Sequence, residues 1–413
     1  MLWLAQLEGG PKRVNHAAVS VGDTIYSFGG YSSEEDYATA RPMDVHMLDT
    51  ISLRWKALPI PTPNTEQYFS TPYQRYGHTT CAYGVFVYVW GGRNDNDGAC
   101  NRLFQFNSET HTWKIISTGG AVPPPRDGHS ACIIADAMYI FGGFEEDFER
   151  FSNEVYVLDL TTMIWSELPT LGAPPQFRDF HTATPIGDRM YVFGGRSDVL
   201  GQFHSNREVY SNVLSYLNTT TQEWIHVLAP TTTTNSSSSG DGSFNRQQQH
   251  KPPCGRRSHS AFSHDDKLYI FGGYNGLTKQ HFNTLHCFDP ATSLWTEIKA
   301  NGLGPQPRRR HCSIFVNGRL FLFGGTSPRD PNADTHMNLL VTGDPDLVDQ
   351  SDLHVLDFNP SLKVLCVYAC LKLGLISKHF DSLPWDLRWD ILALTQPNKI
   401  SSGCVAERMD IRG

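Results

Sequence analysis

The chain has 413 residues and a formal net charge of −8, with 35 glycines, 25 prolines and 12% aromatic residues. The acidic balance argues against a general affinity for nucleic acid. The sequence also shows neither an N-terminal signal pattern nor an apolar run of membrane-spanning length, so we expect no nucleic-acid or membrane partner. Many glycines, prolines and aromatic residues are typical of an all-β protein with many turns.

The chain opens with an apolar run at residues 2–7, which contains Trp3. After it, an aromatic residue followed by two glycines recurs at intervals of about fifty residues, a period typical of propeller blades and not of helical solenoids. An apolar run of strand composition precedes each pair, and we expect the glycines to form a turn where positive φ or close backbone approach excludes a Cβ. The sites are Phe28-Gly29-Gly30, Trp90-Gly91-Gly92, Phe141-Gly142-Gly143, Phe193-Gly194-Gly195, Phe271-Gly272-Gly273 and Phe323-Gly324-Gly325.

Two further positions recur with the same period. A tryptophan opens the expected outer strand at Trp55, Trp113, Trp165, Trp224 and Trp295. An Arg-x-x-His sequence begins each unit, at Arg13/His16, Arg75/His78, Arg126/His129, Arg178/His181, Arg256/His259 and Arg308/His311. The set resembles the kelch repeat, and this resemblance implies an all-β fold, a six-bladed kelch β-propeller over residues 1–358.

The sixth unit lacks a tryptophan of its own, since Lys363 stands at the expected position. A propeller must cover the edges of its first and last sheets. We therefore predict that residues 2–7, with Trp3, form the fourth strand of blade six and close the ring. Between blades four and five, residues 231–253 form a low-complexity stretch of Thr, Ser and Gln, which we interpret as a surface loop.

The nine cysteines are scattered and form no set of zinc-type pairs. Reduced thiols are the simplest interpretation, and they favour a cytoplasmic and nuclear location. We expect no metal and no cofactor.

After Phe358 the apolar pattern changes to the period of a helix, and residues 359–396 are expected to form two helices. The first should begin at Asn359-Pro360, with an apolar stripe at Leu362, Leu365, Cys366, Ala369, Cys370 and Leu373 and a cap at Gly374. The second should begin at Leu383-Pro384, with Leu387, Ile391 and Leu394 on one face. Residues 397–413 are expected to be a flexible tail.

The two helices resemble a VHL box, the adaptor segment of cullin-2 ubiquitin ligase receptors. The resemblance rests on the stretches 361–370 and 383–391, and it departs from the usual pattern at Cys370, where an aliphatic residue is expected. It implies that elongin B/C binds Leu362, Cys366 and Cys370, and that cullin-2 binds Leu383, Pro384, Leu387 and Ile391. The alternative is that both helices only pack under the propeller.

Positions that recur in every blade are interpreted as structural, whereas positions that vary between blades and face the central pocket are candidates for binding. In kelch folds these are the two residues before the His and the residue after Gly-Gly. The candidates before the His are Asn15, Asp127, Asp179, Phe180, Arg257, Ser258, Arg309 and Arg310, and those after Gly-Gly are Tyr31, Arg93, Arg196 and Tyr274. An acidic chain thus gathers five arginines at one mouth, and guanidinium groups hold a carboxylate in bidentate fashion.

The two acidic candidates, Asp127 and Asp179, suit a cation on the same ligand. The alternative is that each pairs with a neighbouring arginine and only closes the ring. Phe180, Tyr31 and Tyr274 are expected to pack against the backbone of the ligand.

Over nearly its full length, the chain resembles the kelch-repeat substrate receptors of cullin-2 RING ubiquitin ligases. The resemblance implies a non-catalytic subunit that captures C-terminal degrons ending in Gly, often after Arg, Lys or Gln, and directs those proteins to proteasomal degradation. In a related receptor the arginine after Gly-Gly in blade four binds the terminal carboxylate, and Arg196 holds that position. Arg257-Ser258 replaces that receptor's Ser-Trp pair, so the pocket differs. Because this chain itself ends in Arg412-Gly413, self-binding is a further expectation.

The kelch fold admits two other functions. A kelch scaffold could bind an internal peptide of a partner without any ligase. A copper radical oxidase shares the kelch fold but needs a copper site of Tyr, Cys and His near the axis, and the sequence shows no such constellation. We therefore expect no catalytic residues.

Overall fold

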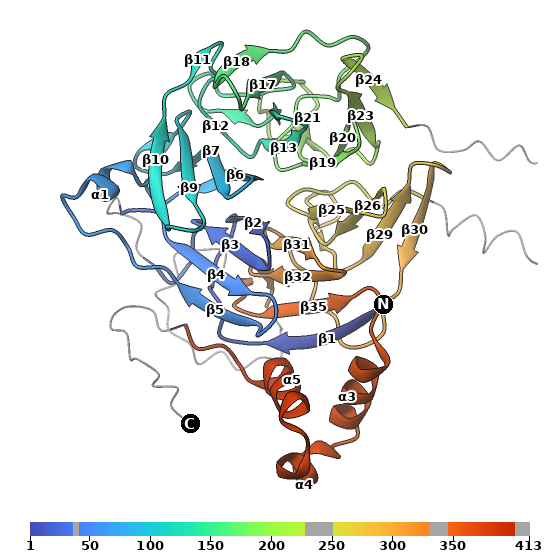
Figure 1. The fold of residues 1–413 in the computed structure, drawn as a ribbon. Coiled ribbons are helices and arrows are strands. Elements are labelled where there is room, and N and C mark those ends of the chain that lie inside the picture. Colours follow the sequence, from blue (N-terminus) through green and yellow to red (C-terminus); the bar gives the residue numbers. More distant parts are fainter. Residues whose placement is uncertain (36–40, 228–250, 330–345, 401–413) are drawn as a thin grey trace, which may run out of the picture.

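The computed structural model describes residues 1–35, 41–227, 251–329 and 346–400. The low-complexity loop predicted at 231–253 falls largely outside these residues, and so do Arg412 and Gly413. The described chain forms sheets arranged around a central axis, with a helical segment at the outer edge of the ring (Figure 1).

Six four-stranded antiparallel sheets form the blades, as the repeats predicted. Blade one has β2 (Ala17–Val21), β3 (Thr24–Phe28), β4 (Val45–Asp49) and β5 (Arg54–Ala57). Blade two has β6 (Tyr76–Tyr83), β7 (Phe86–Asn94), β9 (Leu103–Asn107) and β10 (Thr112–Ile116), and β8 (Gly98–Ala99) pairs with β7. Blade three has β13 (Ser130–Ile134), β14 (Ala137–Phe141), β17 (Val155–Asp159) and β18 (Ile164–Glu167), and β11 (Gly119–Gly120) lies parallel to β18.

The second half of the ring repeats this order. Blade four has β19 (Thr182–Ile186), β20 (Arg189–Phe193), β23 (Ser215–Asn218) and β24 (Glu223–His226). Blade five has β25 (Ser260–His264), β26 (Lys267–Phe271), β29 (Leu285–Asp289) and β30 (Leu294–Ile298). Blade six has β31 (Cys312–Val316), β32 (Arg319–Phe323), β35 (Leu353–Asp357) and β1 (Leu2–Leu7).

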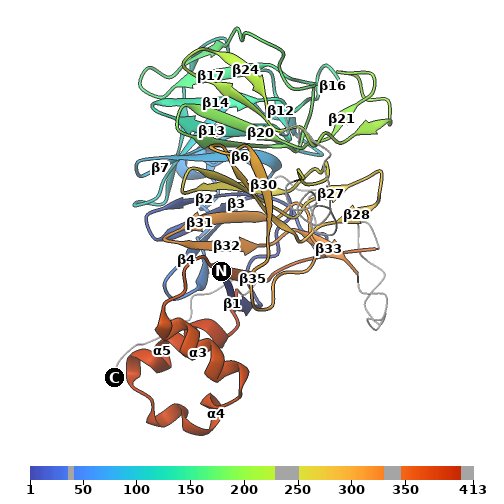
Figure 2. The ribbon, with the colours of Figure 1, turned by 90° about the vertical axis from the view of Figure 1, so that its right-hand side faces the viewer.

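Short strands extend the loops between the second and third strands of the blades on one side of the ring, and in blade three a short strand that precedes the first strand joins them (Figure 2). They are β12 (Arg126–Asp127) with β15 (Phe144–Glu145) and β16 (Arg150–Phe151), β21 (Ser197–Asp198) with β22 (Glu208–Val209), β27 (Tyr274–Asn275) with β28 (Gln280–His281), and β33 (Thr326–Pro328) with β34 (Leu347–Asp349).

The glycine pairs adopt the backbone that the sequence predicted. Both glycines of every pair have positive φ, a conformation that residues with a Cβ rarely adopt. Space is also lacking, because an ideal Cβ on Gly142 would lie 2.7 Å from Cε1 of His181 in the next blade. The glycine turn therefore lets the repeated histidine of one blade pack against the backbone of its neighbour.

Each outer-strand tryptophan packs against the aromatic residue that precedes Gly-Gly in the preceding blade. The ring centroids lie 4.9–6.1 Å apart in the pairs Trp55–Phe323, Trp113–Phe28, Trp165–Trp90, Trp224–Phe141, Trp295–Phe193 and Trp3–Phe271. Such contacts combine apolar burial with the offset or edge geometry that aromatic rings favour. The repeated aromatic residues are thus the contacts that join one blade to the next.

The N-terminal strand closes the ring, as predicted from Trp3. Strand β1 pairs antiparallel with β35, with Trp3 opposite Leu356 and Leu7 opposite Leu353. The indole of Trp3 is 7% exposed and takes the place in blade six that outer-strand tryptophans occupy in the other blades. The last sheet is therefore completed by the first strand, and neither chain end leaves an open edge there.

The C-terminal segment folds into helices α3 (Leu362–Lys372), α4 (Ile376–His379), the 3₁₀ turn η1 (Phe380–Ser382) and α5 (Trp385–Thr395), next to the outer edge formed by β1 and β35 (Figures 1 and 2). A short helix, α1 (Glu66–Ser70), lies beside β10. The prediction that the first C-terminal helix begins at Asn359-Pro360 is wrong. Ser361 is the N-cap, because its hydroxyl accepts a hydrogen bond from the Val364 N–H, so Asn359 and Pro360 belong to the connection. Gly374, with φ +66°, follows α3 as predicted.

Contacts with blade one fix α5 to the propeller. Arg54 Nη2 donates to the carbonyl of Leu392 at 2.8 Å, in the last turn of the helix, where this carbonyl also accepts from the Gln396 N–H at 3.0 Å. The Asn398 side chain accepts from the Trp55 N–H at 3.0 Å and donates to the Leu53 carbonyl at 3.2 Å. The flexible tail predicted from residue 397 is therefore wrong for residues 397–400, because Asn398 is 5% exposed and bonded to the propeller.

Replacing Trp3 by Ala should destabilise the ring by about 3–5 kcal/mol, since it empties a buried aromatic site at the closure between blades. The measurement is the free energy of unfolding in denaturant. Trp385→Ala is a matched control, because Trp385 is 71% exposed and its loss should change stability by about 0.5 kcal/mol or less. Equal effects of the two substitutions would contradict closure through Trp3.

Candidate functional site

The two classes of candidate positions face each other in every blade. The first residue after the repeated arginine forms a backbone bridge with the residue after Gly-Gly. The pairs are Val14–Tyr31, Tyr76–Arg93, Asp127–Phe144, Asp179–Arg196, Arg257–Tyr274 and Arg309–Thr326. These pairs surround one end of the central axis, which we call the mouth. The predicted positions therefore meet at one surface.

A closed cycle of backbone hydrogen bonds forms the floor of the mouth. In each blade the residue directly before the His donates its N–H to the carbonyl of the matching residue next door, at 2.7–3.1 Å. All of these residues have positive φ, and the cycle runs through Asn15, Arg310, Ser258, Phe180, Gly128 and Gly77. Backbone pairing around the axis thus uses this candidate position in every blade, whatever its side chain.

The repeated arginine and histidine lie below this floor and are buried. The guanidinium of Arg178 donates to the Gly194 carbonyl at 2.8 Å, and Arg126 and Arg256 make the equivalent bond to Gly142 and Gly272. The six histidines border an axial cavity of about 120 Å³. Burial lowers the pKa of His259 to about 3, so that the ring stays neutral. These residues are buried and make their contacts inside the ring; that their role is structural stays a prediction.

The five arginines of the mouth differ in their partners. Arg93 pairs with Asp95 and with Glu146, at 3.4 and 3.2 Å. Arg196 holds both carboxylate oxygens of Asp179, and Arg257 lies 3.8 Å from Glu208. Arg309 and Arg310 form no ion pair with any acid in the described part of the chain; Arg310 donates to the Tyr31 hydroxyl at 2.6 Å, and Arg309 lies over the ring of Tyr274 at 4.3 Å.

Among these arginines, Arg309 has the fewest polar partners in the described part of the chain. The residue is 8% exposed, and its Nε is buried with no hydrogen-bond partner among the described residues. Burial, together with the like charges of Arg310 and Arg257, lowers the pKa of Arg309 to about 10. A ligand anion at this side of the mouth would supply the missing partner.

The two acidic candidates have different surroundings. Asp179 is fully buried and paired with Arg196, as the ring-closing alternative predicted for it. Asp127 is 6% exposed, and within the described ranges its carboxylate has neither an ion pair nor a hydrogen bond. Burial and the negative charge of Asp179 raise the pKa of Asp127 to about 7. The same alternative is therefore wrong for Asp127.

Three aromatic candidates lie at the mouth. Tyr31 packs edge-on against Tyr76, Tyr274 stacks with Arg309, and the ring of Phe180 lies where a Cβ on Gly128 would meet it at 3.3 Å.

Two acids at the mouth were not predicted from the sequence. Glu146 and Glu208 pair with the mouth arginines but belong to the loops and short strands beyond the bridges. The repeat pattern carries no signal for them, because those segments differ between blades in length and sequence.

The C-terminal helices expose part of the predicted partner surface. Leu362 is 77% exposed, Cys366 is exposed and Cys370 is partly exposed, so the predicted elongin residues lie on an accessible side of α3. Pro384 is exposed, and Leu383 and Leu387 are half-buried. Ile391 is 4% exposed, so the prediction that it contacts a cullin is wrong for this conformation: its side chain is used inside the protein.

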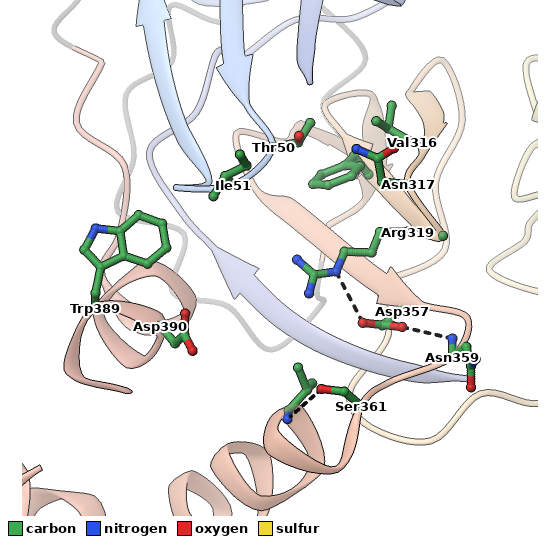
Figure 3. Close-up of a pocket in the computed structure, with 13 residues that line it drawn as sticks. Thr50, Ile51, Val316, Asn317, Arg319, Asp357, Asn359, Ser361, Trp389 and Asp390 are labelled. Atoms are coloured by element: carbon green, nitrogen blue, oxygen red, sulfur yellow. Dashed lines mark hydrogen bonds and ion pairs between the residues drawn. The ribbon is translucent and has the colours of Figure 1, made fainter. Parts of the chain in front are cut away.

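A cavity of about 520 Å³ lies where this helical segment meets the propeller (Figure 3). Ile51 and Asn317 border it on the propeller side, and Trp389 on α5 borders it on the helical side. Two hydrogen bonds join polar groups that border it: Arg319 donates to Asp357 at 3.2 Å, and Asp357 accepts from the Asn359 N–H at 2.9 Å. These bonds fix the connection between β35 and α3.

In the part of the chain that the structure describes, no helix combines the length and apolar character needed to cross a bilayer. Nor does any group of three or more His, Cys, Asp or Glu side chains among these residues suit a metal ion.

Comparison with known proteins agrees with this architecture. A profile described as the KLHDC2/KLHL20/DRC7 Kelch-repeats domain matches residues 77–325 and 239–359. Kelch domain-containing protein 3 from Bos taurus and from Homo sapiens is 46% identical over 408 residues, which cover 98% of both chains. Kelch domain-containing protein 2 from Bos taurus is 29% identical over 301 residues, or 67% of this chain and 70% of that protein. The chain thus belongs to the family of kelch-repeat proteins that includes Kelch domain-containing protein 3.

Proposed function

We propose that this chain is the substrate-recognition subunit of a cullin-2–elongin B/C E3 ubiquitin ligase. The mouth captures the C-terminal end of substrate proteins that finish in Gly, and the helical segment attaches the receptor to the ligase. The chain performs no chemistry in this role; ubiquitin transfer belongs to the associated subunits. The cytoplasm and the nucleus are the compartments in which this function is expected.

The observation that carries the proposal is the pair of uncompensated arginines at the mouth of an acidic protein. Arg309 and Arg310 have no acidic partner in the described ranges, and Arg257 lies close by with only a 3.8 Å contact to Glu208. A buried cation without a counter-ion is costly unless a ligand supplies one. A terminal carboxylate provides two acceptor oxygens in the plane that guanidinium groups favour.

Surface exposure of α3 supports the second half of the proposal. Leu362 and Leu365 on the eleven-residue α3 are 77% and 42% exposed, and its C-cap Leu373 is 71% exposed, which is unusual for three leucines so close together. Val367 is buried, and Val364 and Tyr368 pack against the core that contains β1. The helix thus uses one side for the propeller and leaves an apolar side for a partner's groove.

The Arg412-Gly413 end suggests a regulatory extension of this function. These residues lie outside the described part of the chain, and the sequence alone motivates the idea. A receptor for Gly ends that carries such an end can bind itself, within one copy or between two, at a high effective concentration.

The first prediction concerns the terminal carboxylate. A peptide that ends in Arg-Gly should bind as the free acid at least tenfold more tightly than as the C-terminal amide, a difference of about 1.4 kcal/mol. Arg309→Ala, Arg257→Ala and Arg196→Ala should each weaken binding of the acid, measured by fluorescence anisotropy. Arg189→Ala, which removes a half-exposed arginine of β20 away from the mouth, should bind as the unaltered chain does. Equal binding of acid and amide would favour a kelch scaffold that reads an internal peptide.

The second prediction concerns the ligase surface. Leu362→Arg should abolish co-purification with elongin B/C and cullin-2, because a charge replaces the apolar contact, while the melting temperature stays nearly constant at this exposed site. Leu303→Arg is the matched control, since Leu303 is 74% exposed in the loop after β30. Retention of elongin B/C by the Leu362 variant would count against the adaptor assignment.

The third prediction concerns self-binding. Removal of Gly413 should raise the apparent affinity of the chain for an Arg-Gly peptide, since the competing end is lost. It should also reduce any self-association seen by analytical ultracentrifugation. Unchanged affinity together with an unchanged oligomeric state would rule out capture of the chain's own end.

A further inference from the structure

We propose that the cavity between the helical segment and the propeller binds a small organic acid, that is, a carboxylate attached to an apolar body. The cavity shares no residue with the mouth, and binding there does not depend on the proposed function. Its volume of about 520 Å³ lies within the range of about 300–1,000 Å³ that is typical of sites for small ligands. Such sites are often found where two parts of a protein meet, as they do here.

Three parts of the chain build the walls of this cavity. The hairpin of β31 and β32 contributes Asn317 and Arg319 from blade six, and the turn between β4 and β5 contributes Ile51 from blade one. Val364 of α3 and Trp389 of α5 border it on the helical side. A ligand in the cavity therefore contacts the propeller and the helical segment at the same time (Figure 3).

Arg319 brings a guanidinium group to the cavity. Figure 3 shows this group extending from β32 toward the side on which Ile51 and Asp390 lie. Its Nε donates to Asp357 at 3.2 Å, and none of the hydrogen bonds among the described residues uses its two Nη groups. The side chain is 34% exposed, so these N–H groups are accessible to a ligand. Two N–H groups of one guanidinium fit the two oxygens of a carboxylate.

The two carboxylates that border the cavity already have donors. Asp357 accepts from Arg319 and from the Asn359 N–H. Asp390 of α5 pairs with Lys363 of α3 at 2.6 Å. A cation in the cavity would have to compete for acids that are already paired, and it would face Arg319. The Nη groups of Arg319 are donors, so the ligand group that they suit is an acceptor with a negative charge.

Comparison with blade five shows what is particular to Arg319. Lys267 begins β26 as Arg319 begins β32, and it pairs with Asp289 at the end of β29, at 3.1 Å. An ammonium group is a single compact charge, whereas a guanidinium keeps further N–H groups after it has bound one carboxylate. The helical segment lies beside the outer edge of blade six and adds the remaining walls there. Both the free donors and the enclosed space are therefore features of blade six.

Apolar side chains supply the rest of the lining. Ile51 and Trp389 border the cavity although they are 60% and 38% exposed, and Val364 and Phe321 border it as well. Covering apolar surface of this kind is favourable, and the gain grows with the area that is removed from water. An acid with an apolar body can cover Ile51 and Trp389 while its carboxylate binds Arg319.

The test compares two acids with their uncharged amides on the full chain. The probes are 4-phenylbutyrate and octanoate, which share a carboxylate and differ in the shape of the apolar body. Dissociation constants are measured by ligand-observed NMR titration. At least one acid should bind at least tenfold more tightly than its amide, because only the carboxylate accepts charge-assisted hydrogen bonds from Arg319.

Two substitutions locate the binding. Arg319→Gln should abolish the preference for the acid, whereas Arg189→Gln, at the equivalent first position of β20, should keep it. Ile51→Glu should weaken binding of the acid about tenfold, because it adds a negative charge at the cavity. Ile60→Glu is its control, since Ile60 is 55% exposed and does not border the cavity. Melting temperatures check folding, and Ile51→Glu decides the matter if loss of the bond to Asp357 unfolds the Arg319 variant.

Equal binding of acid and amide for both probes overturns the proposal. So does a preference for the acid that survives both Arg319→Gln and Ile51→Glu, or one that either control variant also abolishes. The tripeptide Phe-Glu-Phe, acetylated and amidated at its ends, carries the same chemistry on a peptide. Binding of this peptide without binding of either free acid overturns the choice of a small molecule. Binding of an Arg-Gly peptide at the mouth is measured beside these titrations and should not change in Arg319→Gln, so that failure of this proposal is distinguished from failure of the proposed function.

Discussion

The closed cycle of six backbone hydrogen bonds around the axis is the constraint on which the mouth depends. Each bond joins the residue before the His of one blade to its counterpart in the next, so every blade is positioned by its neighbours. The positive φ that each of these residues adopts turns its N–H and carbonyl along the ring. Side chains at these positions are consequently free to vary, since the bonds that hold the ring are made by the backbone.

The repeats made most of the fold predictable, because each repeated residue has a role that depends on its type. Gly-Gly permits a backbone that other residues rarely adopt, and the tryptophan packs on the aromatic residue of the preceding blade. Trp3 could be assigned to blade six on this logic alone. The start of α3 could not, because Pro360 suits a first helical turn as well as a connection, and the Ser361 hydroxyl decided between them. The end of the fold was also missed, since nothing local marks Asn398 as a residue bonded to Trp55.

The sequence predicted where the candidate side chains lie, but it did not predict which of their charges pair with each other. The sequence placed five arginines and two aspartates at one mouth, and the bridges between the two candidate positions agree with that. Which charged groups form ion pairs depends on how far each side chain extends. Arg196 pairs with Asp179 across a bridge, whereas Arg309 and Asp127 form no ion pair in the described residues. The acids that pair with the other mouth arginines are Glu146 and Glu208, and they lie in segments that do not repeat between blades. Uncompensated charge, and not charge alone, is therefore the property that separates binding candidates from the ring's own ion pairs.

The contacts that fix α5 to the propeller also bear on how the ring is held closed. The chain itself joins the strands of the ring everywhere except between β35 and β1. At this junction, which we call the seam, only non-covalent contacts hold the ring closed, so a propeller would open there. Asn398 bonds Trp55 and Leu53 on blade one and also donates its N–H to the Glu8 carbonyl just after β1. The chain beyond α3 thus leaves blade six, crosses the seam and fastens on its far side. The helical segment therefore adds a second connection across this seam, beside the pairing of β1 with β35.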